Sequence, residues 1–350
     1  MHIRHNYTHG GDIYTNTVHL DFSANVNPLG TPPEVVEAAA EAAGRMGIYP
    51  DPYCTKLREK LAQKWSVDRD CILCGNGAAE LIFQFVQALK PQNALLPVPS
   101  FSEYASALRA VDCAPTYLYL QREAGFALQE DILREITPQT ELLMLCTPNN
   151  PTGAAIPWEL QLQILDRCRE TGTWLLLDEC FVSLSDPDCR RSLIPELREG
   201  DRVFILRAFT KLYGMAGARL GCGYCRESEI LDKMCALVQP WNVSTMAQAA
   251  GEAALGCEDF VRETLTLIGE EKAYLLRELR RLGIEVLPGR ANYLMLSGVP
   301  GLYEKLLHRG ILIRSCGNYP GLSDGDCRIA VRTHRENVEL IAAIEEVIHG

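Results

Sequence analysis

The chain has 350 residues, of which 47% are hydrophobic and 23% are charged, and its formal net charge is −11. This balance is typical of a globular protein with one large domain or two that share an interface. An acidic chain without a lysine or arginine run is not expected to bind nucleic acid or a membrane surface, and no apolar stretch is long enough to span a bilayer.

Residues 1–30 are polar and rich in glycine, asparagine and proline, and we expect them to form an arm packed on the rest of the protein. The opening "MHIRHNYTHGGD" lacks the apolar segment of a secretory signal, which predicts a cytoplasmic protein with reduced cysteines. Two CxxC pairs, Cys71–Cys74 and Cys222–Cys225, would suit a zinc site. They are far apart and lie in strand-like sequence, so we expect packed thiols and no metal.

Residues 31–242 alternate short apolar runs with amphipathic stretches, and we expect them to form a large α/β domain. Strands are predicted at 94–98, 116–120, 142–146, 173–178 and 203–207. Helical patterns such as 78–90 and 158–170 lie between several of them. Continuous apolar strands between helices indicate a mostly parallel sheet covered on both faces, with ligands at the carboxyl ends of its strands.

Residues 243–350 have a different pattern, which predicts a small α+β C-terminal domain. A long helical stretch at 260–283 precedes short strand-like runs at 284–288, 293–296, 311–314 and 328–332. A final amphipathic helix closes the chain.

Several motifs fall where predicted strands end. The turn "TPNNPTG" (147–153) follows one strand, although a tight turn alone needs these residue types. Asp178 ends another strand, where a buried carboxylate needs a partner; a helix cap or a salt bridge would also satisfy it.

Lys211 follows the run 203–207, where desolvation would lower its pKa and favour the nucleophilic free amine over a solvated loop charge. The segment "GNGAA" at 75–79 opens a helix whose N–H groups could bind an anion, although glycine before a helix is common.

In combination, these motifs resemble the fold type I pyridoxal-phosphate enzymes of the aspartate aminotransferase superfamily. The similarity includes Arg219, eight residues after Lys211, and runs from "DFSANVNPLG" to "RIAVRTHRENVELI". It implies a large domain with a mostly parallel sheet between helices, a small α+β domain, pyridoxal 5'-phosphate as cofactor, and a homodimer with shared active sites.

By this resemblance, Lys211 carries the cofactor as a Schiff base and later moves the proton at the substrate's reacting carbons. Asp178 pairs with the protonated pyridine nitrogen. Asn150 bonds the 3-oxygen of the ring, and Phe101, in "VPSFSEY", stacks on the ring face.

The resemblance also implies a site for the cofactor phosphate. Gly77 and Ala78 would donate N–H groups, with Thr210 and Arg219 around the phosphate. Tyr49, in "IYPDP", resembles the tyrosine that reaches this phosphate from the neighbouring subunit.

One position departs from the superfamily pattern. The superfamily commonly has tyrosine three residues after the aspartate, and this chain has Phe181 there. We expect the missing hydroxyl to alter the Schiff-base pKa and to leave Asn150 as the main partner of the ring 3-oxygen.

The tail "RIAVR" suggests a substrate site. In a strand, Arg328 and Arg332 would face one way, and Arg314 ends a neighbouring run. Such guanidiniums suit a carboxylate and a phosphate, although a solvated edge strand would also explain them. The resemblance implies that Arg328 holds the α-carboxylate and that Arg314 and Arg332 hold the substrate phosphate. It also implies a substrate contact for Asn27.

Within the superfamily, the chain resembles two groups that act on phosphorylated compounds. "HGGD", "GNGAAELI", Phe181 and the tail are similar to the threonine-phosphate decarboxylases of the cobalamin pathway. We therefore expect a lyase that decarboxylates O-phospho-L-threonine, or a relative such as O-phosphoserine, to an amino-alcohol phosphate. A histidinol-phosphate-type aminotransferase is the alternative. A regulatory cofactor-binding module is a third hypothesis. Regulators of this superfamily carry an added DNA-binding domain, and we expect no spare length for one in this chain.

Overall fold

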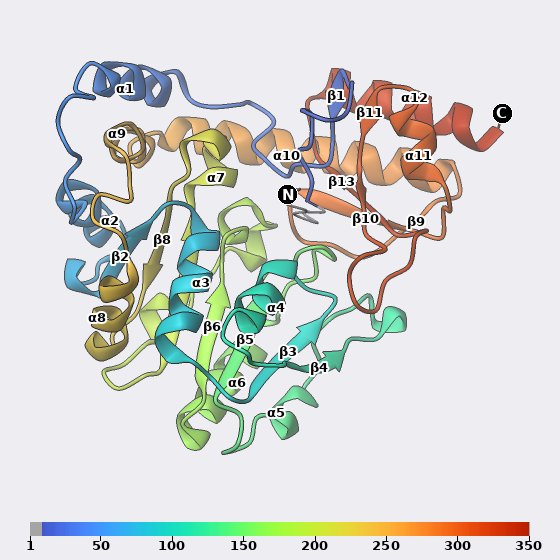
Figure 1. Cartoon of the computed structure of the whole chain (residues 1–350). Helices are drawn as coiled ribbons and strands as arrows, with labels where there is room; N and C mark the ends of the chain where they lie inside the picture. Colours follow the sequence, from blue (N-terminus) through green and yellow to red (C-terminus); the bar gives the residue numbers. More distant parts are fainter. Residues whose placement is uncertain (1–8, 350) are drawn as a thin grey trace, which may run out of the picture.

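The central element of the protein is a seven-stranded sheet, and the computed structural model describes residues 9–349 (Figure 1). The sheet has the order β2–β8–β7–β6–β5–β3–β4. Its strands are β2 (Ile72–Gly75), β3 (Ala94–Val98), β4 (Thr116–Tyr119), β5 (Leu142–Cys146), β6 (Trp174–Asp178), β7 (Val203–Ala208) and β8 (Gly221–Tyr224). Strands β4, β3, β5, β6 and β7 pair in parallel, and β8 is antiparallel to both β7 and β2. The predicted mostly parallel α/β sheet is confirmed.

Helices cover both faces of this sheet. They are α1 (Pro33–Ala43), α2 (Thr55–Trp65), α3 (Ala78–Leu89), α4 (Ser102–Arg109), α5 (Ile132–Glu135), α6 (Trp158–Thr171), α7 (Phe209–Leu212), α8 (Ser228–Leu237) and α9 (Thr245–Ala254). Side chains of α3, α4 and α8 share one buried cluster with the sheet, and those of α2, α5, α6 and α9 share the other. Because successive strand residues point to opposite faces, a strand buried on both sides reads as a continuous apolar run.

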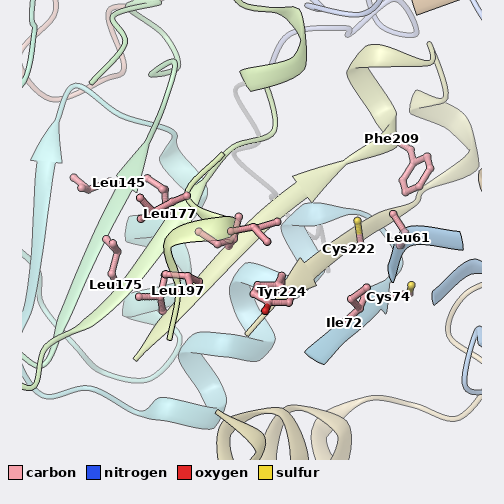
Figure 2. Packing of buried hydrophobic residues seen from close by; sticks show 14 of the residues in the cluster. Leu61, Ile72, Cys74, Leu145, Leu175, Leu177, Leu197, Phe209, Cys222 and Tyr224 are labelled. Atoms are coloured by element: carbon pink, nitrogen blue, oxygen red, sulfur yellow. The ribbon is translucent and has the colours of Figure 1, made fainter. Parts of the chain in front are cut away.

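Strand β5 illustrates this alternation. Leu143 and Leu145 belong to the cluster with α6, whereas Leu142 and Met144 belong to the cluster with α3. Figure 2 shows part of the cluster with α6, where Leu145 lies near side chains of the neighbouring strands.

The rest of the chain forms a second unit, which we call the C-terminal unit. It consists of α10 (Glu258–Arg281), β9 (Glu285–Val286), β10 (Tyr293–Ser297), α11 (Leu302–Leu307), β11 (Ile311–Leu312), β12 (Arg314–Ser315), β13 (Cys327–Ala330) and α12 (His334–His349). Its antiparallel sheet has the order β12–β13–β10–β9. No helix within residues 9–349 is long and apolar enough to cross a membrane.

Two segments next to the expected domain boundaries, residues 20–22 and helix α9, pack with parts of the chain other than those that the boundaries suggest. Of the expected arm, residues 1–8 lie outside the described part. Strand β1 (Leu20–Asp21) pairs in parallel with β11, and Phe22 is fully buried in the core of the C-terminal unit. Helix α9 packs into the core of the large sheet instead, although the sequence placed it in the C-terminal domain.

The two CxxC pairs lie on neighbouring strands. Cys74 of β2 is opposite Cys222 of β8, and both are buried in the cluster that contains α2. Cys225 is buried in the cluster on the other face. The described residues contain no group of three or more histidine, cysteine or acidic side chains that could hold a metal ion.

Candidate active site

A cavity of about 380 Å³ lies between the carboxyl ends of the large sheet's parallel strands and the C-terminal unit. The predicted site residues that line it are Ala78, Phe101, Asn150, Asp178, Thr210, Lys211, Arg219, Arg314 and Arg328. Phe181 also lines it. Four predicted residues do not line it, namely Tyr49, Gly77, Asn27 and Arg332.

The strand ends explain why distant residues meet here. Asp178 is the last residue of β6, Asn150 follows β5, and Lys211 lies in the short helix α7 after β7. Because β5, β6 and β7 are parallel neighbours, their carboxyl ends lie at the same edge of the sheet.

Asp178 is 5% exposed, and two donors hold its carboxylate. The hydroxyl of Tyr104 donates to Oδ2 at 2.7 Å, and the backbone N–H of Cys180 donates to Oδ1 at 2.8 Å. Burial raises the pKa of Asp178, and these hydrogen bonds oppose the rise. The carboxylate is therefore fixed in orientation, with its charge facing the cavity.

Tyr104 is a site residue that the sequence analysis missed. It is fully buried on α4, one helical turn after Phe101, and the two rings meet edge to face at 5.6 Å. Its spacing from Phe101 was the only available signal, because one helical turn places both side chains on the same face.

Lys211 faces the open cavity, so its side chain is only partly buried. The cavity wall nevertheless removes much of its hydration. Burial and then the charge of Arg328 lower the pKa of Lys211 to about 8. Its Nζ lies 5.9 Å from the ring centre of Phe181, which is buried edge-on against Tyr293. The fraction of free amine near neutral pH is therefore larger than for an ordinary lysine, although most of the amine stays protonated.

The start of α3 and Arg219 form an anion cradle. Gly77 has a φ of +90°, and a Cβ there would lie 2.7 Å from Nη2 of Arg219, so only glycine permits this close approach. A Cβ on Gly221 would lie 2.4 Å from the backbone nitrogen of Ala78. No side chain caps the start of α3. Backbone N–H groups and a guanidinium thus converge where a phosphate would bind.

Arg314 and Arg328 form the opposite wall of the cavity. They are directly paired residues of β12 and β13, and are 7% and 5% exposed. Arg328 donates to the backbone oxygen of Ser23 at 2.7 Å and to Oδ1 of Asn150, and its Nε has no partner. A buried guanidinium is costly unless its donors are satisfied, and the unpartnered Nε of Arg328 therefore favours an anionic ligand at this wall.

Asn27 does not reach the cavity. It is 1% exposed, and its Nδ2 donates to the backbone oxygen of Leu212 at 2.6 Å and to Thr264 at 2.8 Å. These bonds tie the N-terminal segment to α7 and α10. Asn25 lines the cavity instead, with its Oδ1 unpartnered.

Arg332 also lies away from the position expected for it. Strand β13 ends at Ala330, so the alternation that would align Arg332 with Arg328 stops before it. Its guanidinium instead bonds Glu336 in the first turn of α12, with Nη2 at 2.8 Å from Oε1. Arg314 is therefore the arginine that shares this wall of the cavity with Arg328.

Tyr49 lies on the outer surface of its own chain. Its side chain is 75% exposed and stacks on Trp241, with ring centres 4.3 Å apart. It lines a separate hollow with Thr55 and Gln248.

The cavity residues fit pyridoxal 5'-phosphate. The start of α3 at Ala78 and the guanidinium of Arg219 suit its phosphate, and the ring of Phe101 provides an apolar face. The fixed carboxylate of Asp178 suits a protonated ring nitrogen, and the amine of Lys211 suits the aldehyde.

Residues 17–344 match the family model described as aminotransferase class I and II. The chain is 38% identical over 335 residues to the threonine-phosphate decarboxylase of Salmonella typhimurium, covering 95% of this chain and 92% of the relative. It is 34% identical over 336 residues to the histidinol-phosphate aminotransferase of Symbiobacterium thermophilum, covering 94% and 90%. The predicted superfamily is confirmed.

Solved structures share the fold over nearly the whole chain. The histidinol-phosphate aminotransferase from Clostridium acetobutylicum has a TM-score of 0.87 and 29% identity, covering 94% of this chain and 99% of that one. The enzyme of the same name from Sinorhizobium meliloti, solved in complex with pyridoxal 5'-phosphate, has a TM-score of 0.84 and 24% identity, covering 95% and 91%.

Removing the hydroxyl of Tyr104 tests the geometry around Asp178. We expect Tyr104→Phe to lower the free energy of unfolding of the cofactor-free protein by about 1.5 to 3 kcal/mol, because it deletes a buried bond to a charged group. Tyr293→Phe is the control, since that hydroxyl donates to a neutral backbone oxygen, of Asn149, at 2.7 Å; it should cost about 0.5 to 1.5 kcal/mol. Urea titration measures both, and equal losses would contradict a charged Asp178.

The reactivity of Lys211 tests its electrostatic environment. In competitive labelling of the cofactor-free protein with acetic anhydride, read by mass spectrometry, its acetylation should titrate with a midpoint near 8. Arg328→Gln should move this midpoint upward, because a nearby positive charge disfavours the protonated amine. Arg309→Gln, a surface change, is the control. An unchanged midpoint in Arg328→Gln would exclude the arginine as a cause.

Proposed function

The chain belongs to the class I and II aminotransferase family, and from this premise we propose that it decarboxylates O-phospho-L-threonine, or a close relative such as O-phosphoserine, in cobalamin biosynthesis. Its cofactor is pyridoxal 5'-phosphate, as the sequence predicted. The products from O-phospho-L-threonine would be carbon dioxide and aminopropanol phosphate. The observation that carries the substrate class is the pair of buried arginines, Arg314 and Arg328, on one cavity wall.

Two fixed positive charges favour a substrate with two anionic groups. In this proposal Arg328 binds the α-carboxylate, because its charge acts directly on Lys211 and its unpartnered Nε can donate another bond. Arg314, on the neighbouring strand, binds the substrate phosphate. Asn25, which lines the cavity, replaces Asn27 as the proposed substrate contact. Arg332 does not line the cavity and is not proposed to bind the substrate.

The remaining cavity residues hold the cofactor in this proposal. Asp178 pairs with the ring nitrogen, and Asn150 bonds the ring 3-oxygen. Phe101 stacks on the ring, and Thr210 and Arg219 bind the phosphate beside the start of α3. Tyr104 acts on the ring only through Asp178.

When bound, pyridoxal phosphate supplies an electron sink for a bond that breaks at the substrate Cα. In the proposed reaction, Arg328 orients the carboxylate so that the bond between Cα and the carboxyl carbon breaks. Carbon dioxide leaves, and the electron pair of that bond is finally used to form a new bond between Cα and a proton. Lys211 delivers this proton, because its lowered pKa lets the amine accept and donate protons near neutral pH.

Two observations favour decarboxylation over amino transfer. The match to the Salmonella decarboxylase is stronger, at 38% identity against 34% for the aminotransferase. Phe181 lines the cavity where the superfamily commonly has a tyrosine, as in the decarboxylase pattern. Several relatives are nevertheless named histidinol-phosphate aminotransferase, which keeps amino transfer as the competing outcome.

We further propose that two copies of the chain assemble with shared active sites. Large apolar side chains gather on the surface near Tyr49, with exposures of 69% for Met46, 70% for Ile48, 71% for Tyr53 and 44% for Trp241. Large exposed apolar side chains concentrated in one segment indicate an interaction surface more often than scattered ones do. A second copy covering this patch would bring Tyr49 toward the partner's phosphate cradle.

The reaction is tested with cofactor-loaded protein and O-phospho-L-threonine in the absence of any keto acid. We expect carbon dioxide and aminopropanol phosphate over many turnovers, because decarboxylation regenerates the cofactor whereas amino transfer stops after one half-reaction. Arg314→Gln should raise KM by about tenfold or more, since it removes a charged contact to the phosphate. If histidinol phosphate and 2-oxoglutarate give glutamate while no carbon dioxide appears, the decarboxylase proposal is wrong.

The assembly is tested by light scattering on purified protein. We expect the wild type to have twice the chain mass of 38.9 kDa. Ile48→Glu should give single chains that retain the cofactor less well, because it places a charge in the proposed interface. Val338→Glu is the matched control, since this valine on α12 is 43% exposed and lies outside the patch. A wild-type mass of one chain would overturn the shared-site proposal.

A further inference from the structure

A buried carboxylate outside the cavity connects the large sheet to the wall that holds the two arginines. Asp326 precedes β13 and is 1% exposed. It accepts hydrogen bonds from Nη1 and Nη2 of Arg122 at 2.9 and 2.7 Å, from Oγ of Ser297 at 3.1 Å, and from N and Oγ of Ser323 at 2.8 and 2.9 Å. Three of these donors belong to the C-terminal unit, and only Arg122 comes from the large sheet.

Asp326 closes the segment 316–326, which borders the cavity. Its backbone oxygen accepts from the N–H of Cys316 at 2.8 Å, and its own N–H donates to Ser323 at 3.0 Å. The closed segment carries Asn318, which accepts from Arg314 Nη2 at 2.9 Å. It also carries Tyr319, which lines the cavity with its ring centre 5.1 Å from the Arg314 guanidinium.

Arg328 depends on the same carboxylate through the chain itself. It follows Asp326 by two residues, and its strand pairs with the strand of Arg314. Asp326 is therefore linked through the backbone to both strands that carry Arg314 and Arg328.

Arg122 anchors this carboxylate to the large sheet. It opens the short turn after β4, the strand at the edge of the large sheet (Figure 1). Its guanidinium also lies 5.2 Å from the ring centre of Phe126, which is buried against Leu287 and Met295 of the C-terminal unit. The ion pair and this apolar contact both lie where the large sheet meets the C-terminal unit. The Nη atoms of the arginine are held by Asp326, and the face of its guanidinium packs on Phe126.

We propose that Arg122 is a positioning residue for the substrate. Through Asp326 it holds the segment 316–326 and strand β13 against the large sheet. It thereby sets Arg314 and Arg328 at a fixed separation from Lys211. The inference rests on the proposed binding of a phosphorylated substrate at these arginines, and it does not require that carbon dioxide be the product.

The chain contains a second ion pair of the same construction that serves as a matched control. Nε and Nη2 of Arg169 donate to the two oxygens of Asp201, both at 2.7 Å, and Asp201 is 5% exposed. This pair joins α6 to the segment before β7, and neither residue lines the cavity. It has a comparable structural role without a connection to the substrate arginines.

The experiment compares Arg122→Met, Arg122→Lys and Arg169→Met in the full, cofactor-loaded protein. The dissociation constants of O-phospho-L-threonine and of histidinol phosphate are read from the first rapid change in cofactor absorbance after stopped-flow mixing, before turnover. Cofactor affinity and Tm are measured in parallel. We expect Arg122→Met to weaken binding of the phosphorylated compound by about tenfold or more, because small displacements of binding groups are costly, with cofactor affinity unchanged. Arg122→Lys should recover part of the affinity, since it keeps the charge but not the two-pronged geometry.

Arg169→Met should lower Tm to a similar extent and leave substrate binding unchanged. The inference is overturned if both Met variants lose Tm equally and bind the substrate like the wild type, or if Arg122→Met weakens cofactor and substrate alike. It is also overturned if neither phosphorylated compound binds the wild-type protein. Failure of carbon dioxide release with intact binding would reject the proposed reaction alone, because the ratio of dissociation constants still measures the effect of Arg122.

Discussion

Strands β3, β5, β6 and β7 run parallel and are buried on both faces, and this arrangement sets the positions of Asn150, Asp178 and Lys211. Inside the sheet the backbone polar groups are hydrogen-bonded and the side chains are buried and apolar, so neither is available to bind a ligand. Polar side chains gather where the strands end, and the parallel direction brings those ends to one edge. Asp178 and Lys211 are therefore neighbours in space although they belong to different strands.

Burying these groups leaves an electrostatic imbalance that ligands can relieve. Lys211, Arg219, Arg314 and Arg328 place four basic side chains around a cavity whose main acidic group is Asp178. The pKa of Lys211 is lowered, and this lysine is the one of the four that can lose its proton readily. The arginines stay charged, so the site favours anionic ligands. A dianionic cofactor phosphate at α3 and an anionic substrate at the other wall would each neutralise part of this charge.

The sequence predicted the sheet and most of the cavity because strand ends and the motifs on them are local features. It failed where the position of a side chain depends on the exact end of an element. Arg332 turns to Glu336 because β13 stops at Ala330, and no residue type in "RIAVR" marks that end. Asn25 and Asn27 lie in an irregular segment whose alternation is not fixed. Tyr104 could not be chosen because its role depends on the tertiary position of α4, which brings its hydroxyl to Asp178 at the end of β6.

The cavity is built from two halves, and this division bears on the choice of reaction. The cofactor residues proposed here belong to the large sheet, whereas the proposed substrate arginines belong to the C-terminal unit. The bond that breaks at Cα is decided by the orientation of the substrate relative to the cofactor ring. In the proposed reaction, that orientation would depend on the position of Arg328 relative to Asp178 and Lys211. Contacts between the two halves, such as Arg122 with Asp326, would then act on the substrate without touching it.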